Sequence, residues 1–225
     1  MINLPRLIGD ELNNIWSGHQ DEPFCQFPPL AIETIDNSNL VFIGINPSLG
    51  EKEMQRLRAK NDSSCEYYPL NKDQSLTHKY FKKFYDIAEK TKMDWTHFDL
   101  LYIRETQQQK IRNLLKAEAG IDFIYRQLML SKEIMEVLLS TEKFKVFVVN
   151  NTLARDFLGK DRPLNYSIER EHWMDYRFVW DDDWGTYRLG NHAFFFISML
   201  TGQRALDKGS YERLIWHIKF LKGKI

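Results

Sequence analysis

The sequence predicts a single α/β domain over residues 1–225, in which helices flank both faces of a mainly parallel central sheet to form three layers. Two observations carry this prediction. Short apolar runs, typical of buried parallel strands, alternate with segments of helical periodicity. The chain has 225 residues and is 43% hydrophobic, which is enough for one sizeable core and short for two domains.

The elements follow from local patterns. Four apolar runs predict core strands at 40–46, 98–103, 144–150 and 193–198. Helical spacing of apolar residues predicts helices at 78–90, at 121–141 and from 152, and a last helix with Ser210 as its N-cap. Two short runs, 176–180 and 186–189, flank the sequence DDDWG and predict a hairpin. Its three aspartates are those of a solvated tip rather than of a cation site.

The charge distribution bears on nucleic-acid binding. The chain has 31 basic and 31 acidic residues, and proteins that bind DNA usually have an excess of Lys and Arg. That excess exists locally, because residues 201–225 contain six basic and two acidic residues. The sequence therefore predicts a positive segment at the C-terminal end.

Several classes of site are excluded or disfavoured. Cys25 and Cys65 are the two cysteines of the chain, so it cannot build a four-cysteine zinc or iron–sulfur site. The six histidines show no metal-binding spacing, and the GxGxxG, GxxxxGK[ST] and GxSxG patterns are lacking. We expect no metal and no cofactor.

The N-terminal residues contain acids and amides where a signal peptide has an apolar run. No segment approaches the roughly 20 apolar residues of a membrane span. Two distant cysteines favour a reducing compartment over a disulfide scaffold. These features predict a cytoplasmic protein, which we expect to be a monomer.

Open parallel sheets place functional residues beyond the carboxyl ends of their strands. That rule selects 46–49, 99–105, 150–152 and 199–204 in this sequence. The segment 150–152, Asn-Asn-Thr, either binds a phosphate at a helix N-terminus or caps the helix that follows.

The segment from Gly44 to Gly50 has the sequence GINPSLG. Pro47 fixes its φ and lacks an N–H, and the two glycines permit a tight backbone path. The segment would hold the side chain of Asn46 at the tip of a strand. A plain turn after a strand would use the same residues, so both interpretations stay open.

The strand and the GINPS sequence resemble the first motif, GINPG, of the mismatch-specific branch of the uracil-DNA glycosylase superfamily. The resemblance implies that Asn46 positions the water that attacks the sugar. It also implies substrate contacts from Gly44, Ile45, Pro47 and Ser48. Ser48 stands where the family has a glycine, which limits how closely the backbone can approach a base.

The segment after the last core strand, Met199-Leu-Thr-Gly-Gln-Arg204, is similar to the second motif of that family. Thr201 and Gly202 match its serine and glycine, and Met199 takes the place of its histidine or asparagine. The resemblance implies catalysis by Thr201 and substrate contacts from Met199 and Gly202. The implied DNA-binding residues are Gln203 as a wedge, Arg204 at a phosphate or in the vacated stack, and Lys208 and Arg213 in the basic helix.

Two further positions are read through the resemblance. Asp99 takes the place of a family asparagine that reads the edge of uracil. Because an ionised carboxylate only accepts hydrogen bonds, Asp99 indicates an altered base or a structural residue. Tyr67 or Tyr68 either supplies an aromatic platform for a flipped base or anchors a loop.

The leading hypothesis is a DNA glycosylase-like protein of base-excision repair that hydrolyses the N-glycosidic bond of a damaged or mismatched base, uracil or a related one. Asn46 and Thr201 would then face one crevice. Met199 cannot donate a hydrogen bond to the departing base. The chain therefore lacks the family's stabiliser of the anionic base, unless Thr201, Arg204 or backbone N–H groups replace it. Two alternatives are a catalytically silent member that binds nucleic acid or a nucleotide, and a hydrolase of free nucleosides.

Overall fold

The computed structural model describes residues 1–60, 64–70, 72, 80–159, 173–202 and 205–223. The fold is α/β, with a six-stranded, mostly parallel sheet flanked by helices. The chain groups into two compact units, each made of separate stretches. The first contains Met1–Ile35, Ile45–Pro69 and Asp99–Glu136, and the second contains Asp36–Gly44, Leu70–Phe98 and Val137–Ile225.

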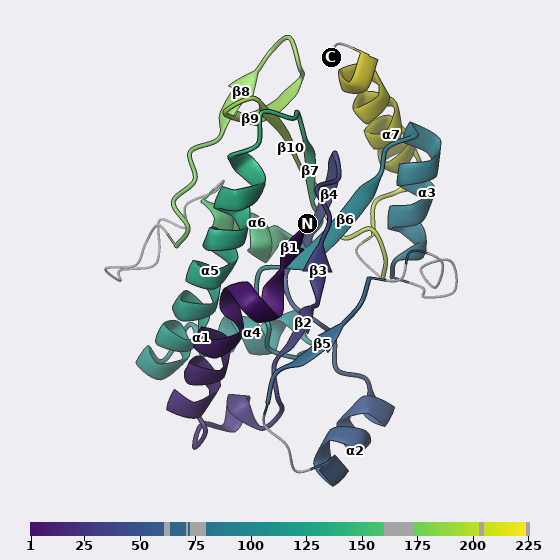
Figure 1. The fold of residues 1–225 in the computed structure, drawn as a ribbon. Coiled ribbons are helices and arrows are strands. Elements are labelled where there is room, and N and C mark those ends of the chain that lie inside the picture. Colours follow the sequence, from purple (N-terminus) through teal and green to yellow (C-terminus); the bar gives the residue numbers. More distant parts are fainter. Residues whose placement is uncertain (61–63, 71, 73–79, 160–172, 203–204, 224–225) are drawn as a thin grey trace. The chain divides into compact units, whose positions relative to one another are not determined.

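The sheet lies in the second unit, apart from Asp99 at the end of one strand (Figure 1). Its strand order is β6-β4-β7-β10-β9-β8. Strand β7 pairs in parallel with β4 and β10, and β9 pairs antiparallel with β10 and β8. The strands are β4 (Leu40–Gly44), β6 (Trp95–Asp99), β7 (Val146–Val149), β8 (Val179–Asp181), β9 (Thr186–Leu189) and β10 (His192–Phe196). The predicted mainly parallel sheet is confirmed, and so is the hairpin.

The predicted bounds of β6 were wrong. The strand spans Trp95–Asp99 instead of 98–103. Its middle contains Thr96 and His97, which are polar but fully buried and so interrupt the apolar run. Residues 100–103 are also buried, but they belong to the segment that follows the strand.

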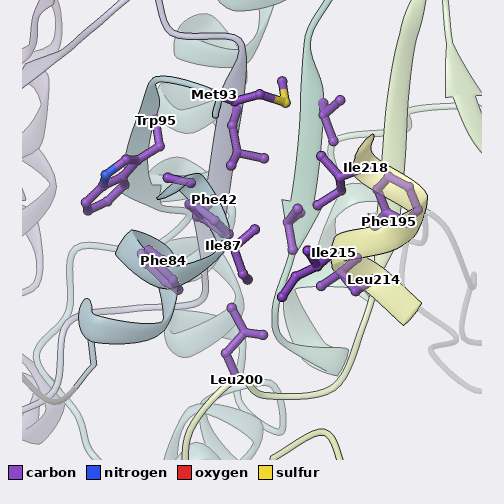
Figure 2. Close-up of a cluster of buried hydrophobic side chains, with 14 of the residues drawn as sticks. Phe42, Phe84, Ile87, Met93, Trp95, Phe195, Leu200, Leu214, Ile215 and Ile218 are labelled. Atoms are coloured by element: carbon purple, nitrogen blue, oxygen red, sulfur yellow. The ribbon is translucent and has the colours of Figure 1, made fainter. Parts of the chain in front are cut away.

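One face of the sheet is covered by α3 (Lys82–Thr91) and α7 (Lys208–Gly223). Figure 2 shows side chains of both helices converging on the strands. The ring of Phe84 in α3 stacks on that of Phe42 in β4, with centroids 4.2 Å apart. Leu214 and Ile218 of α7 pack in the same cluster as Phe195 of β10. Burial of this apolar surface is what fixes α3 and α7 on the sheet.

Two helices begin close to residues for which the sequence predicted a cap. Helix α6 (Thr152–Leu158) begins after Asn151, whose side chain accepts hydrogen bonds from the backbone N–H groups of Leu153 and Ala154. The capping alternative for 150–152 is therefore the one observed. Helix α7 begins at Lys208 rather than after Ser210, because the Asp207 carboxylate accepts a 2.9 Å hydrogen bond from the Ser210 N–H and caps the helix.

The first unit contains two small sheets and most of the remaining helices. Strands β1 (Ile2–Asn3) and β3 (Thr34–Ile35) pair antiparallel, and β2 (Leu30–Ile32) pairs in parallel with β5 (Glu66–Tyr68). The helices are α1 (Leu4–Gly18), the short 3-10 turn η1 (Pro23–Cys25), α2 (Glu51–Lys60), α4 (Gln108–Leu114) and α5 (Glu118–Leu139), whose last three residues belong to the second unit. Within the described ranges, no helix is both long and apolar enough to cross a membrane.

Candidate functional site

The side-chain amide of Asn46 is held by three backbone carbonyls. Its Nδ2 donates to the carbonyl oxygens of Pro47, Ile103 and Glu105 at 2.9, 3.1 and 2.7 Å. An amide nitrogen has two N–H groups, so one of them is shared between two acceptors. Three acceptors on one side fix the rotation of the amide and direct Oδ1 away from them. Among the residues that the structure describes, none donates a hydrogen bond to this oxygen.

Backbone pairing continues beyond the ends of β4 and β6. The Leu101 N–H donates to the Ile45 carbonyl at 2.8 Å, and the Glu105 N–H donates to the Pro47 carbonyl at 3.0 Å. The Thr106 hydroxyl accepts from the Leu49 N–H and donates to the Leu49 carbonyl. The segments 45–49 and 101–106 are therefore hydrogen-bonded along their length, and the side chain of Asn46 bridges the two.

Several residues of the first motif are ordered by this pairing. Gly44 is the last residue of β4 and is buried, whereas Ile45 is half-buried at the bend that follows. Pro47 is buried and Ser48 is exposed. Of this group, Ser48 is therefore the residue whose side chain is most open to a ligand in solution.

Arg104, which lies in the range 99–105 selected from the sequence but was given no role of its own there, anchors the second of these segments. Its side chain is 1% exposed and donates to the Pro28 carbonyl at 2.9 Å. It also forms ion pairs with Glu53 at 2.9 Å and Glu66 at 2.5 Å. Hydrogen bonding from Arg56, together with Lys60 and Arg104, lowers the pKa of Glu66 to about 2. This ionic cluster fixes the peptide whose neighbouring carbonyls orient Asn46.

The two tyrosines of β5 point in different directions. Successive side chains of a strand lie on opposite faces, so Tyr67 and Tyr68 do not share a surface. The Tyr67 hydroxyl is buried, and a Cβ atom placed on Gly9 of α1 would lie 3.1 Å from it. Burial raises the pKa of this hydroxyl well above its usual value. This packing against α1 favours the anchoring role for Tyr67.

The second motif forms a closed turn after β10. The Leu206 N–H donates to the Met199 carbonyl at 2.9 Å, and the Ala205 N–H donates to the Gly202 carbonyl at 3.2 Å. Gly202 has φ of +92°, which side chains rarely tolerate, so a glycine is required there. The Met199 Cε atom would lie 3.8 Å from a Cβ on Gly202. The thioether therefore packs on the turn itself.

The predicted site residues are distributed over both units. Asn46 and Asp99, which is half-buried at the end of β6, belong to the first unit. The half-buried Thr201 belongs to the second unit with the rest of the second motif. Lys208 and Arg213 are exposed on α7. Gln203 and Arg204 lie outside the described residues.

In the described part of the chain there is no cluster of three or more His, Cys, Asp or Glu side chains that could bind a metal ion. The chemistry available is that of an oriented amide, a hydroxyl, backbone groups and exposed basic side chains. No protein-family model matches the sequence, and no curated protein matches it.

Proposed function

We propose that this protein is DNA glycosylase-like and hydrolyses the N-glycosidic bond of a damaged or mismatched base in DNA, uracil or a related one. The observation that carries the proposal is the fixed amide of Asn46, with its donors engaged and its oxygen directed away. The resemblance of the Gly44–Ser48 sequence to the GINPG motif supports the same role.

The chemistry follows from the orientation of the amide. A neutral amide cannot take up a proton usefully, but its oxygen accepts a hydrogen bond from water. A water that donates one O–H to Asn46 Oδ1 would be held by that hydrogen bond, with a lone pair available to attack C1′ of the sugar. Positioning of this kind is effective only when the orienting group is itself rigid, and here three carbonyls supply that rigidity.

The base must first leave the helical stack, at a cost of a few kcal/mol that binding of the flipped nucleotide offsets. As the glycosidic bond breaks, negative charge develops on the departing base. Met199 has no donor for this charge, because a thioether only accepts weakly. We assign the donor role to the hydroxyl of Thr201, which stands next to the glycine turn.

A second candidate function is nucleic-acid binding without catalysis. The observation that favours it is the packing of Met199 on Gly202, which puts an apolar group where the family has a donor. Loss of one such donor typically lowers kcat by about 10²–10³. A member that had lost it could keep DNA affinity through the basic helix α7 alone.

In the decisive experiment, the protein is incubated under single-turnover conditions with labelled duplexes that contain uracil, a thymine mismatch, hypoxanthine or an alkylated base. The formation of abasic sites is then measured. Free deoxyuridine is tested in parallel. We expect base release from at least one duplex, and a loss of about 10²-fold or more in Asn46→Ala. Asn113→Ala, at an exposed asparagine of the same unit, serves as the control.

Each outcome separates the candidates. Release from duplex but not from deoxyuridine supports the proposal. Release only from deoxyuridine would replace it with a nucleoside hydrolase. DNA binding without release from any substrate would establish the binding function instead. Equal rates for wild type and Asn46→Ala would remove Asn46 from the mechanism.

A further inference from the structure

Helix α7 exposes a large aromatic side chain to solvent. Trp216 is 64% exposed, and its ring stacks nearly parallel on that of Phe220, with centroids 5.5 Å apart and planes 8° apart. The apolar residues of the opposite face, including Leu214, Ile215 and Ile218, are buried against the sheet. Trp216 therefore contributes little to the core, and its neighbour holds it as a flat, oriented surface.

This surface lies between two chemically different flanks. On one flank, Glu212 of α7 forms a 3.6 Å ion pair with Lys90 of α3. Lys219, two helical turns after Glu212, lies on the same side of α7. On the other flank, His217 hydrogen-bonds the Trp184 carbonyl at the tip of the β8–β9 hairpin, 2.6 Å away. Figure 1 shows α3 and α7 side by side.

The flank toward α3 is basic. Helix α3 contains three lysines and two acidic residues, and α7 contains four basic residues and one acidic residue. Asp86 and Glu212 both pair with Lys90, and Asp86 also accepts a hydrogen bond from the Tyr211 hydroxyl at 2.6 Å. Lys222 donates to the carbonyls of Thr91 and Lys92, so the positive surplus comes from the other basic side chains. In the described ranges, Lys219 forms no ion pair within 4 Å.

The hairpin flank is acidic, with Asp181, Asp182 and Asp183 at or next to the tip. Of these, Asp181 pairs with Arg188 at 2.9 Å. A polyanion would be repelled from this flank and attracted to the other. The charge pattern therefore favours a polyanion that runs along α7 on the side of Lys219, next to Trp216.

We propose that this α3–α7 face binds a nucleic-acid strand with unpaired bases, and that one base stacks on Trp216 while Lys219 contacts a phosphate. A flat aromatic ring beside basic side chains is the arrangement that single-stranded nucleic acids require, because every base has a π-face and every linkage is anionic. The inference rests on nucleic acid being the partner proposed above, but not on bond cleavage.

The test measures binding of a fluorescein-labelled oligothymidylate of about 12 nucleotides, and of a duplex of equal length, by anisotropy. We expect Trp216→Ala to weaken oligothymidylate binding on the order of tenfold, with a much smaller effect on duplex, since stacking on one ring is lost. Trp216→Phe keeps a ring and should retain most of the affinity. Trp180→Ala is the matched control, because Trp180 is 51% exposed on β8, away from this face.

Salt dependence provides a second readout. Lys219→Ala should reduce the slope of log affinity against log salt by about 0.7 for the single strand. Oligothymidylate affinity that is unchanged in Trp216→Ala, or absent in wild type, would overturn the inference. So would a dimer in sedimentation that Trp216→Ala dissociates, because the ring would then contact a second copy.

The outcomes also separate this inference from the proposed function. Wild type that binds oligothymidylate through Trp216 but releases no base contradicts the glycosylase proposal alone. Wild type that releases a base, with binding unaffected by Trp216→Ala, contradicts this inference alone.

Discussion

The Nδ2 atom of Asn46 donates to the carbonyl oxygen of Glu105 over 2.7 Å, although 59 residues separate the two in sequence. This contact joins the segments that follow β4 and β6. The same side chain that we propose as the water-positioning group is therefore also a structural link. Substitutions at Asn46 will affect both stability and chemistry, and the two effects have to be measured separately.

We expect Asn46→Ala to lower the free energy of unfolding by about 1–3 kcal/mol, because three carbonyls lose their shared donor. Urea denaturation monitored by tryptophan fluorescence measures this change. Asn113→Ala, at an exposed position, should stay within about 0.5 kcal/mol of wild type. A variant as stable as wild type would show that water replaces the amide at no cost.

The ionic cluster around Arg104 predicts a specific acid sensitivity. The folded-state pKa of Glu66 is lowered to about 2 from 4.5, chiefly by hydrogen bonding from Arg56. Its contribution is therefore present above about pH 4.5 and is lost as the pH falls toward 2. We expect Glu66→Gln to destabilise the protein by about 1–3 kcal/mol at pH 6, with the gap to wild type narrowing by pH 3.

Glu11→Gln is the control for this experiment, because Glu11 pairs with Arg126 at the surface and its side chain is 50% exposed. Its effect should stay below about 1 kcal/mol. A constant gap between wild type and Glu66→Gln from pH 6 to pH 3 would contradict the expected pH dependence.

Lys145 predicts a pH dependence of the same sign in the alkaline range. Its side chain is fully buried, with Nζ donating to Asn37 Oδ1 at 2.5 Å and to the Ser38 carbonyl at 3.0 Å. Burial lowers the pKa of Lys145 to about 8 from 10.5. Between these values the unfolded chain binds the proton more tightly, so stability rises with pH.

We expect wild type to gain about 2 kcal/mol relative to Lys145→Met between about pH 7 and pH 9.5. Comparing the two proteins at each pH cancels the titration of the tyrosines. Lys116→Met, at an exposed lysine, should track wild type. Parallel curves for wild type and Lys145→Met would show that Lys145 keeps its usual pKa.

Duplex affinity should depend on the start of α7. Replacing Lys208 and Arg213 by alanine, together with Arg204, should reduce the salt slope by about 0.9 for each phosphate contact that is lost. Titrations at about 50 to 200 mM salt give the slope. Lys52→Ala, at an exposed lysine of α2, should leave it unchanged. Equal slopes for the triple variant and wild type would place DNA on another surface.

Met199→His should raise the rate of uracil release, because an imidazole supplies the donor that the thioether lacks. The Met199 side chain lies over the Gly202 turn, so the new ring would stand beside the proposed donor Thr201. Single-turnover rates on uracil-containing duplex measure the gain. Met199→Leu, which restores no donor, controls for the change of shape, and a rate increase in that variant would point to packing instead.

The sequence alone determined those parts of the fold that are local or continuous. Strands β4, β7 and β10 were predicted because buried parallel strands are unbroken apolar runs, and the hairpin was predicted from its acidic tip. Strand β6 was misplaced because Thr96 and His97 are polar and yet buried. Helix α1 was not predicted, although its buried residues Leu4, Ile8, Leu12 and Ile15 have helical spacing.

The candidate site shows the same division. A short motif at a strand end was enough to select Asn46, because residue types and spacing are written in the chain. Its partners are the carbonyls of Pro47, Ile103 and Glu105, and backbone carbonyls carry no side-chain signature. In the sequence, Arg104 is likewise a single charge next to an apolar run. Its ion pairs with Glu53 and Glu66 form only in the folded protein. Only the tertiary structure decided these contacts, because they join segments that the chain brings together through folding and not through sequence proximity.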